Sequence, residues 1–133
     1  GSIRKAIARH STHRKRMAAL DDGDGKAAHT DYRVLERMAH ATLAEARLHT
    51  GRTHQIRVHF QYLGYPLVGD RTYARGQNAQ LVDRTGYNAP RQMLHAAKLG
   101  FTHPTTGKEI NCEAPWPEDF REALRVLGSS IAH

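Results

Sequence analysis

The chain has 133 residues and 39% hydrophobic content, which suffices for one modest core, and no apolar run in it is long enough to span a membrane. Its single cysteine excludes an internal disulfide and a cysteine-based zinc site, and it favours a reducing, cytoplasmic setting. The formal net charge of +7 is typical of proteins that bind nucleic acids.

Most of the excess positive charge lies in residues 1–16. Six lysine and arginine side chains occur there, and the first acidic residue is Asp21. The other 117 residues carry 14 basic and 13 acidic side chains, so they are close to neutral. We therefore expect a basic RNA-facing segment at residues 1–16, although a merely solvated arm would have the same composition. The expected RNA contacts are Arg9, His10, Arg14, Lys15 and Arg16.

The first third of the chain predicts extended structure. Residues 3–9 could form either a short helix or an extended arm, and residues 17–20 are short and apolar, as at the end of a strand. Residues 21–26 are rich in Gly and Asp and predict a turn. Residues 30–38 and 42–48 alternate as β-strands do, and the short connection between them predicts an antiparallel pair.

A helical period replaces this alternation in the next segment. Ile56 and Phe60 recur at helical spacing and are expected to anchor the segment in the core, which predicts an amphipathic helix over residues 54–63. Thr53 can act as its N-cap, and Gly64 stands where helices often end in a left-handed residue.

The C-terminal half is expected to contain a loop, a hairpin and a closing helix. Residues 74–90 predict a surface loop with at most one helical turn, and residues 95–113 predict a β-hairpin around a turn at 104–107. A final helix is expected over residues 117–127, ending at Gly128. The order of strands, helix, hairpin and helix indicates an α+β fold.

The spacing of reactive side chains favours neither a metal site nor a nucleophile. His10 and His13 lie in a basic segment that repels a cation, while His54 and His59 face different sides of the expected helix. Cys112 has no evident base beside it, and neither a Gly-rich phosphate loop nor a Gly-x-Ser-x-Gly turn occurs.

Hydrogen-bond donors crowd the start of the helix expected at residues 54–63. The donors lie within six residues and comprise Arg52, His54, Gln55 and Arg57. A helix N-terminus adds free N–H groups and a positive dipole, so this point suits a phosphate or a carboxylate. A capped, basic surface helix is the alternative interpretation.

The same segment resembles a hallmark motif of a known family. It reads Leu48-His49-Thr50-Gly51-Arg52-Thr53-His54-Gln55-Ile56-Arg57-Val58-His59, followed by Gly64-Tyr65-Pro66-Leu67-Val68-Gly69-Asp70 and Tyr73. This run is similar to a motif of the RluA/RluD family of RNA pseudouridine synthases. Matching flanks extend the resemblance over nearly the whole chain, at Ile7-Ala8-Arg9-His10 with Arg14 and Met17, Leu94-His95-Ala96, His103-Pro104 with Gly107, and Ala114-Pro115.

The resemblance implies an enzyme that isomerises specific uridines of RNA, in particular of large-subunit ribosomal RNA, to pseudouridine without a cofactor or a metal. It implies a catalytic domain built on a mixed, mostly antiparallel sheet flanked by short helices, with the RNA cleft across its middle. Residues 1–133 would be the C-terminal portion of that domain and would hold one side of the cleft. The full enzyme is expected to be a cytoplasmic monomer that binds RNA, but neither DNA nor membranes.

The resemblance also assigns roles to residues. The family's arginine falls on Arg57, which would pair with a catalytic Asp, and Arg52, His54 and Gln55 would contact RNA. The catalytic Asp of the family lies in a His-Arg-Leu-Asp motif that does not occur in this sequence. We therefore expect the chain to be a truncated domain that is inactive alone, and Asp70 to belong to another context.

Two other hypotheses use the same residues. A non-catalytic RNA-binding module would need the basic segment and the helix start, but no catalytic Asp. A DNA-binding regulator would need a recognition helix, for which residues 54–63 are short. A His-Arg-Leu-Asp motif encoded upstream would separate the enzyme from the binding module.

Overall fold

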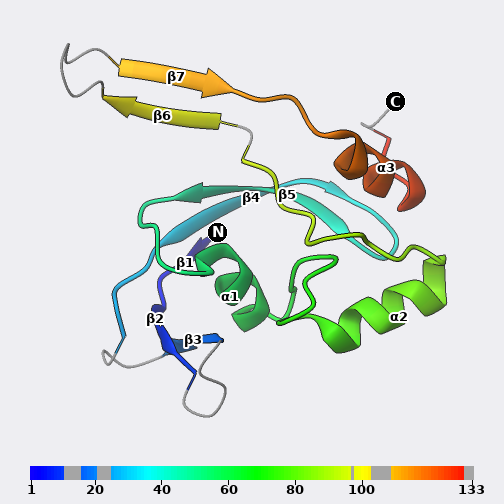
Figure 1. The fold of residues 1–133 in the computed structure, drawn as a ribbon, viewed down its shortest axis with the longest axis horizontal. Helices are drawn as coiled ribbons and strands as arrows, with labels where there is room; N and C mark the ends of the chain where they lie inside the picture. The colour runs from blue at the N-terminus through cyan, green and yellow to red at the C-terminus, as the bar shows by residue number, and fades with distance from the viewer. Residues whose placement is uncertain (11–15, 21–24, 97, 103–108, 131–133) are drawn as a thin grey trace.

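A computed structural model describes residues 1–10, 16–20, 25–96, 98–102 and 109–130. In chain order its elements are β1 (Ser2–Ile3), β2 (Ala6–Arg9), β3 (Met17–Leu20), β4 (Thr30–Arg37), β5 (Thr42–Leu48), α1 (Gln55–Tyr62), α2 (Arg75–Thr85), β6 (Lys98–Thr102), β7 (Glu109–Glu113) and α3 (Glu118–Val126). Figure 1 shows the long β4–β5 hairpin crossing the molecule, with α1 below it and the β6–β7 hairpin above it in that view.

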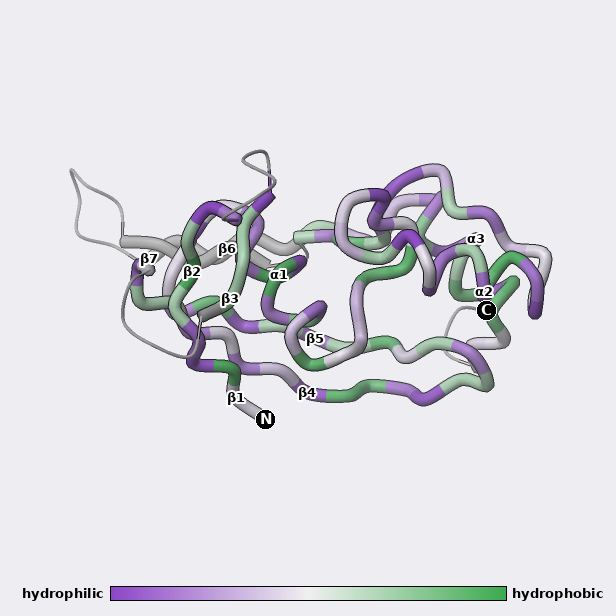
Figure 2. The backbone as a smooth tube through the Cα atoms, turned by 90° about the horizontal axis from the view of Figure 1, so that it is seen from below, coloured by the Kyte–Doolittle hydropathy of each residue, from purple (hydrophilic) through white to green (hydrophobic). Residues whose placement is uncertain are grey.

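The β4–β5 hairpin is the antiparallel pair predicted at residues 30–38 and 42–48. Its ladder runs from Thr30 opposite Leu48 to Arg37 opposite Thr42, with one irregularity after Val34. The short strand β1 pairs with the other edge of β4, so the sheet order is β1-β4-β5. Figure 2 shows hydrophilic and hydrophobic stretches along β4, and the neighbouring side chains of Val34 and Leu35 are both exposed.

Of the two states considered for residues 3–9, the extended one is confirmed and the helix is wrong, because the segment contains β1 and β2. β2 pairs antiparallel with β3, with Ile7 opposite Ala19. The backbone N–H and carbonyl of Ile7 also exchange 2.9 Å hydrogen bonds with Lys26, and the Ile7 side chain is buried. These non-local hydrogen bonds fix a strand where the local sequence allowed either state.

Helix α1 confirms the helix predicted over residues 54–63, but it starts differently. Its N-cap is His54 rather than Thr53, and no side chain caps it. His54 has φ 55° and ψ 24°, a left-handed conformation that is uncommon for a residue with a Cβ atom. The helix ends as expected before Gly64, whose φ is 87°.

The buried face of α1 is more polar than the sequence indicated. Val58 and His59 are 0% exposed, whereas Ile56 and Phe60, the expected anchors, are only partly buried. The core around Val58 contains Ile7, Ala28 and Tyr73, with Met17 and Ala19 packed against it. A buried histidine therefore takes a place that the helical period had assigned to apolar side chains.

The loop predicted at residues 74–90 is wrong over most of its length, because α2 occupies it. Leu81 is the one buried residue of this polar helix, so the sequence contains no apolar stripe that would reveal it. Tertiary contacts stabilise the helix instead. The Asn78 carboxamide accepts a 2.9 Å hydrogen bond from the Gly69 N–H and donates one of 3.1 Å to the Asp70 backbone carbonyl.

The last three elements agree with the sequence. β6 and β7 pair antiparallel from Lys98 opposite Glu113 to Thr102 opposite Glu109, and the predicted turn at 104–107 lies outside the described residues. Helix α3 confirms the closing helix, and Gly128 follows it with φ 93°. A second core cluster joins this helix to the α2 region through Leu81, Tyr87 and Ala123.

The α+β class is confirmed. Every strand pair among the described residues is antiparallel, and the pairs form three small sheets rather than one. Within the same ranges, no helix combines the length and the apolar composition that a membrane span requires.

Candidate active site

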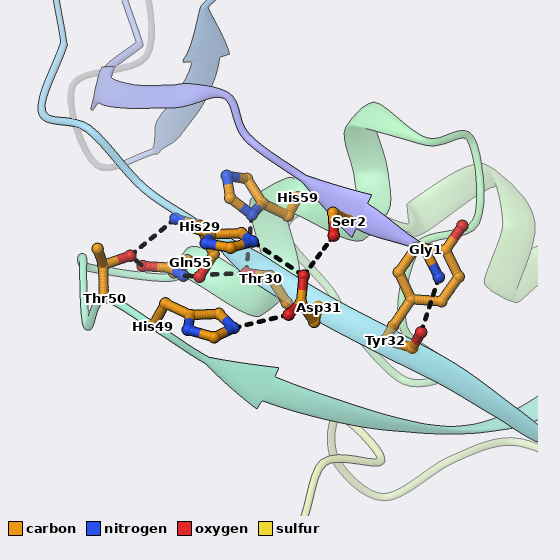
Figure 3. A network of polar contacts seen from close by, with 10 residues as sticks. All are labelled: Gly1, Ser2, His29, Thr30, Asp31, Tyr32, His49, Thr50, Gln55 and His59. Carbon is orange, nitrogen blue, oxygen red and sulfur yellow. Dashed lines mark hydrogen bonds and ion pairs between the residues drawn. The ribbon is translucent and has the colours of Figure 1, made fainter.

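The Gln55 carboxamide fixes the chain that enters α1 (Figure 3). Its NH₂ group donates to the His29 carbonyl at 3.0 Å and to the Thr30 hydroxyl at 2.9 Å. Its oxygen accepts from the Thr50 hydroxyl at 2.7 Å and from the Arg52 backbone N–H at 2.9 Å. Gln55 is 3% exposed and the hydrogen-bonding capacity of its side chain is used inside the fold, and an RNA contact by Gln55 stays a prediction.

The buried side chain of His59 extends this hydrogen-bond network into the core. Its Nε2 lies 2.8 Å from the Lys5 carbonyl oxygen and its Nδ1 lies 2.8 Å from the Thr30 hydroxyl. A carbonyl can only accept, so Nε2 carries the proton and the Thr30 hydroxyl donates to Nδ1. Burial lowers the pKa of His59, against the opposing effect of the Lys5 carbonyl. A neutral imidazole therefore joins α1 to β4 and to the β1–β2 connection.

His54 is held by Tyr73 at the exposed end of the same helix. The Tyr73 hydroxyl accepts the Met17 backbone N–H at 2.8 Å and lies 2.8 Å from His54 Nδ1. The hydroxyl can donate its proton to Nδ1 or accept one from it, depending on the tautomer of His54. Burial, followed by the nearby charge of Arg57, lowers the pKa of His54 and keeps its ring neutral.

Arg57 and Asp70 form a buried, bidentate ion pair. Arg57 Nε donates to Asp70 Oδ2 at 2.9 Å, and Nη2 donates to Oδ1 at 3.0 Å. The side chain of Asp70 is 0% exposed, and its Oδ1 also accepts the backbone N–H groups of Thr72 and Tyr73 at 3.0 and 3.1 Å. Burial alone would raise the pKa of Asp70, but the hydrogen bonds from Arg57 and from the two backbone groups hold it below its ordinary value.

The ion pair fixes the position of the Arg57 guanidinium group but uses only some of its N–H donors. Asp70 takes two of the five N–H donors of Arg57, and the guanidinium carbon lies 5.0 Å from the centre of the Tyr73 ring. The hydrogen bond to Asp70 raises the pKa of Arg57, so its charge is permanent. Such a group can orient a second carboxylate or a phosphate that approaches from the partly exposed side.

A cavity of about 210 Å³ lies next to this cluster. It is lined by His10, Arg16, Met17, Ala18, Ala19, Gln61, Tyr62 and Tyr73. His10 and Arg16, two of the residues expected to contact RNA, therefore line the same cavity as Tyr73. The Tyr73 hydroxyl in turn contacts His54.

Of the other residues expected to contact RNA, Arg9 and Arg52 are not among those that line this cavity. Arg9 ends β2 with an exposed side chain, and Arg14 and Lys15 lie outside the described residues. The Arg52 side chain is exposed, and its Nε donates to the Ala27 carbonyl at 2.8 Å. An RNA contact by these four residues stays a prediction.

Asp70 and Tyr73 are the members of the cluster that the sequence interpretation missed. The sequence predicts another context for Asp70 and a partner of Arg57 outside these 133 residues. A signal existed, because Gly69, Asp70 and Tyr73 belong to the matched motif and a buried arginine requires a counter-charge. Pairing of Arg57 with a further, catalytic Asp remains a prediction.

A group with metal-ligand geometry was also missed. One ligand atom from each of His29, Asp31 and His49 lies within 4.8 Å of the others, in the described part of the chain. The histidine spacing gave no sign of it, because the three residues come from the paired ends of two strands.

Comparison with known proteins points to one family. A family model described as RNA pseudouridylate synthase matches residues 1–62. A ribosomal large subunit pseudouridine synthase D of Pseudomonas aeruginosa is 45% identical over 132 residues, which cover 96% of this chain and 41% of the relative. The synthase D of Zymomonas mobilis is 42% identical over 127 residues, covering 96% of this chain and 40% of the relative. The chain thus spans about two fifths of the length of these relatives.

Solved structures agree on the fold. Human RNA Pseudouridylate Synthase Domain Containing 1 is 35% identical with a TM-score of 0.69, over 88% of this chain and 48% of that chain. Human RNA Pseudouridylate Synthase Domain Containing 4 is 22% identical with a TM-score of 0.68, over 96% of this chain and 56% of that chain, which supports the fold alone.

Proposed function

The chain belongs to the RluA/RluD family of RNA pseudouridine synthases, and from this premise we propose that the protein containing it converts specific uridines of large-subunit ribosomal RNA to pseudouridine. The observation that carries the proposal is the Arg57–Asp70 pair in the family motif. It holds a permanent cation beside Tyr73 and His54, next to a cavity lined by His10 and Arg16.

The reaction is an isomerisation. The bond from the ribose C1′ to N1 of uracil breaks, the base turns, and C1′ bonds to C5, while a proton leaves C5 and N1 gains one. The family resemblance calls for a carboxylate that acts at the ribose or the base. Arg57 would orient that carboxylate through the N–H donors that Asp70 does not use, and would keep it ionised.

Asp70 does not fit the role of that carboxylate. Both of its oxygens already accept hydrogen bonds, from Arg57 and from the backbone N–H groups of Thr72 and Tyr73, and its side chain is 0% exposed. We infer that the acting Asp comes from the part of the protein that precedes this segment. The 133 residues alone should then be inactive, because positioned catalytic groups act as a unit.

RNA would reach the cluster with its target base turned out of the stack, since the reacting atoms are inaccessible within a helix. The positive side chains of Arg9, Arg14, Lys15 and Arg16 would contact the phosphate backbone, and of these Arg16 lines the cavity. Replacing Arg16 with Ala should reduce the slope of log Kd against log salt by about one, which filter binding over a salt series measures. An unchanged slope would remove Arg16 from the interface.

The direct test uses the full-length protein and ribosomal RNA, with pseudouridine measured by mass spectrometry. Wild-type protein should form pseudouridine, and Arg57→Ala should lose turnover far more than it loses RNA affinity. Arg84→Ala removes an exposed arginine of α2 and serves as the matched control. RNA binding without pseudouridine formation by the wild-type protein would instead support the non-catalytic binding module.

A further inference from the structure

Two histidines and an aspartate converge where β1, β4 and β5 meet, outside the Arg57 cluster (Figure 3). Thr30 faces α1, where it contacts His59, so by strand alternation its neighbours His29 and Asp31 face the other way. His49 joins them from the end of β5, with its backbone N–H donating to the His29 carbonyl at 3.1 Å.

Both imidazole rings aim the same nitrogen at one carboxylate. His29 Nε2 lies 2.8 Å from Asp31 Oδ1, and His49 Nε2 lies 2.7 Å from Asp31 Oδ2. The two rings are stacked, with centroids 4.1 Å apart and an interplanar angle of 13°. Imidazole nitrogen and carboxylate oxygen are the donors that bind Zn²⁺ and its neighbours at roughly 2.0–2.2 Å, and one such atom from each of the three residues lies within 4.8 Å of the others.

The backbone that carries the ligands is held in place. The His29 N–H donates to the Thr50 hydroxyl at 2.9 Å, and its carbonyl accepts from the buried Gln55 carboxamide at 3.0 Å. Ser2 in β1 donates its hydroxyl proton to Asp31 Oδ1. All three ligands therefore stand on paired strand ends whose neighbours are fixed, as a preorganised site requires.

The charge balance favours a cation of borderline softness. With neutral histidines the three side chains carry one negative charge, and each ring would bind the ion through Nε2 with its single proton on Nδ1. The Asp31 carboxylate supplies that charge, and Ser2 and His49 hydrogen-bond to it. Arg47 lies opposite Asp31 in the ladder, and its charge would weaken the site without removing it.

We propose that His29, Asp31 and His49 bind one divalent transition-metal ion, of which Zn²⁺ is the representative. Three protein ligands leave a fourth position for water or for a ligand from outside. The inference is independent of the proposed catalytic function, because none of the three residues contacts Arg57 in a described interaction. An ion here would tie the end of β5 to the start of β4, next to the chain that enters α1.

Calorimetric titration of the full-length protein with ZnCl₂ tests the site. Wild-type protein should give a saturable heat of binding with about one ion bound per chain. Asp31→Asn and His49→Gln should each weaken this binding about tenfold or more, which is the usual loss of metal affinity when one interaction in a metal site is removed. His40→Ala, which removes an exposed histidine from the β4–β5 turn, should leave the affinity unchanged.

Imidazole ¹⁵N spectra identify the ligands if other histidines also bind. Zn²⁺ should shift the Nε2 resonances of His29 and His49 together, and MgCl₂ at the same concentration should not. Absence of binding by the wild-type protein, equal binding by the Asp31→Asn and His49→Gln variants, or shifts confined to other histidines would each overturn the proposal.

Discussion

Two bidentate arginine–aspartate pairs occur in the described structure, and they differ mainly in burial. Arg57 and Asp70 meet at 2.9 and 3.0 Å with side chains 15% and 0% exposed. Arg91 and Asp119 meet at 2.6 and 2.8 Å with side chains 38% and 36% exposed. The two pairs share one hydrogen-bond geometry, so their differences isolate the effect of the surroundings.

The partners of the two arginines indicate different tasks. Arg91 also donates from Nη1 to the carbonyl oxygens of Gln92 and Leu94, at 2.9 and 3.1 Å, so it ties the segment before β6 to α3. Arg57 instead lies over the Tyr73 ring and keeps N–H donors that Asp70 does not take. We conclude that the exposed Arg91–Asp119 pair joins two segments of the fold. The buried Arg57–Asp70 pair instead holds a positive charge that can bind a further group.

The largest expected difference between the pairs is in stability. Asp70→Asn should lower the free energy of unfolding by about 3–5 kcal/mol, because it leaves the Arg57 charge enclosed without a partner. Asp119→Asn should have a much smaller effect, since solvent already screens both of its charges. Urea unfolding of the two full-length variants measures the contrast, and equal losses would show that burial does not distinguish the pairs.

A smaller effect is expected from the hydroxyl that braces the buried pair. Tyr73→Phe removes the group that accepts the Met17 N–H and contacts His54, and should cost about 1–3 kcal/mol. Tyr87 is the matched control, because it is also buried but the contact of its hydroxyl among the described residues is a weak one of 4.0 Å to Met93 Sδ. Similar losses in Tyr73→Phe and Tyr87→Phe would mean that the bracing contributes nothing specific.

The smallest expected effect is a gradual change of the free energy of unfolding with pH, caused by the buried side chain of His59. The pKa of His59 is lowered in the folded state from its ordinary 6.5, so the unfolded chain binds the proton first. The contribution of His59 to stability is therefore complete above that value and is lost as the pH falls towards the folded pKa. Unfolding measured from about pH 8 to about pH 5 should show this decline, and His59→Gln should flatten it. A slope unchanged by the substitution would assign the decline to other groups.

Local patterns in the sequence predicted much of the fold. The alternation of residues 30–38 and 42–48 and the helical period after Gly51 are properties of neighbouring residues, and both were confirmed. Helix α2 was missed because its stability depends on Leu81 and Asn78 contacting other parts of the chain. Local composition cannot report such contacts.

The candidate site was predicted only in part, for a similar reason. The motif identified Arg57, but its partner Asp70 is 13 residues away and is brought close by the turn that follows α1. Gln55 and His59 look like surface residues in the sequence, and their burial depends on hydrogen-bond partners in β4. Polar residues enter a core when distant groups satisfy them, and no local spacing encodes this.

Substitution of each arginine with lysine tests the central claim most directly, because lysine keeps the charge but loses the planar fork. The measurement is the single-turnover rate of pseudouridine formation by full-length Arg57→Lys and Arg91→Lys proteins at saturating ribosomal RNA. We predict that Arg57→Lys slows the reaction by about 100-fold, the cost of a misplaced catalytic group, while Arg91→Lys reacts like the wild type. Wild-type rates for Arg57→Lys, or equal losses in both variants, would contradict the assignment of the buried pair to catalysis.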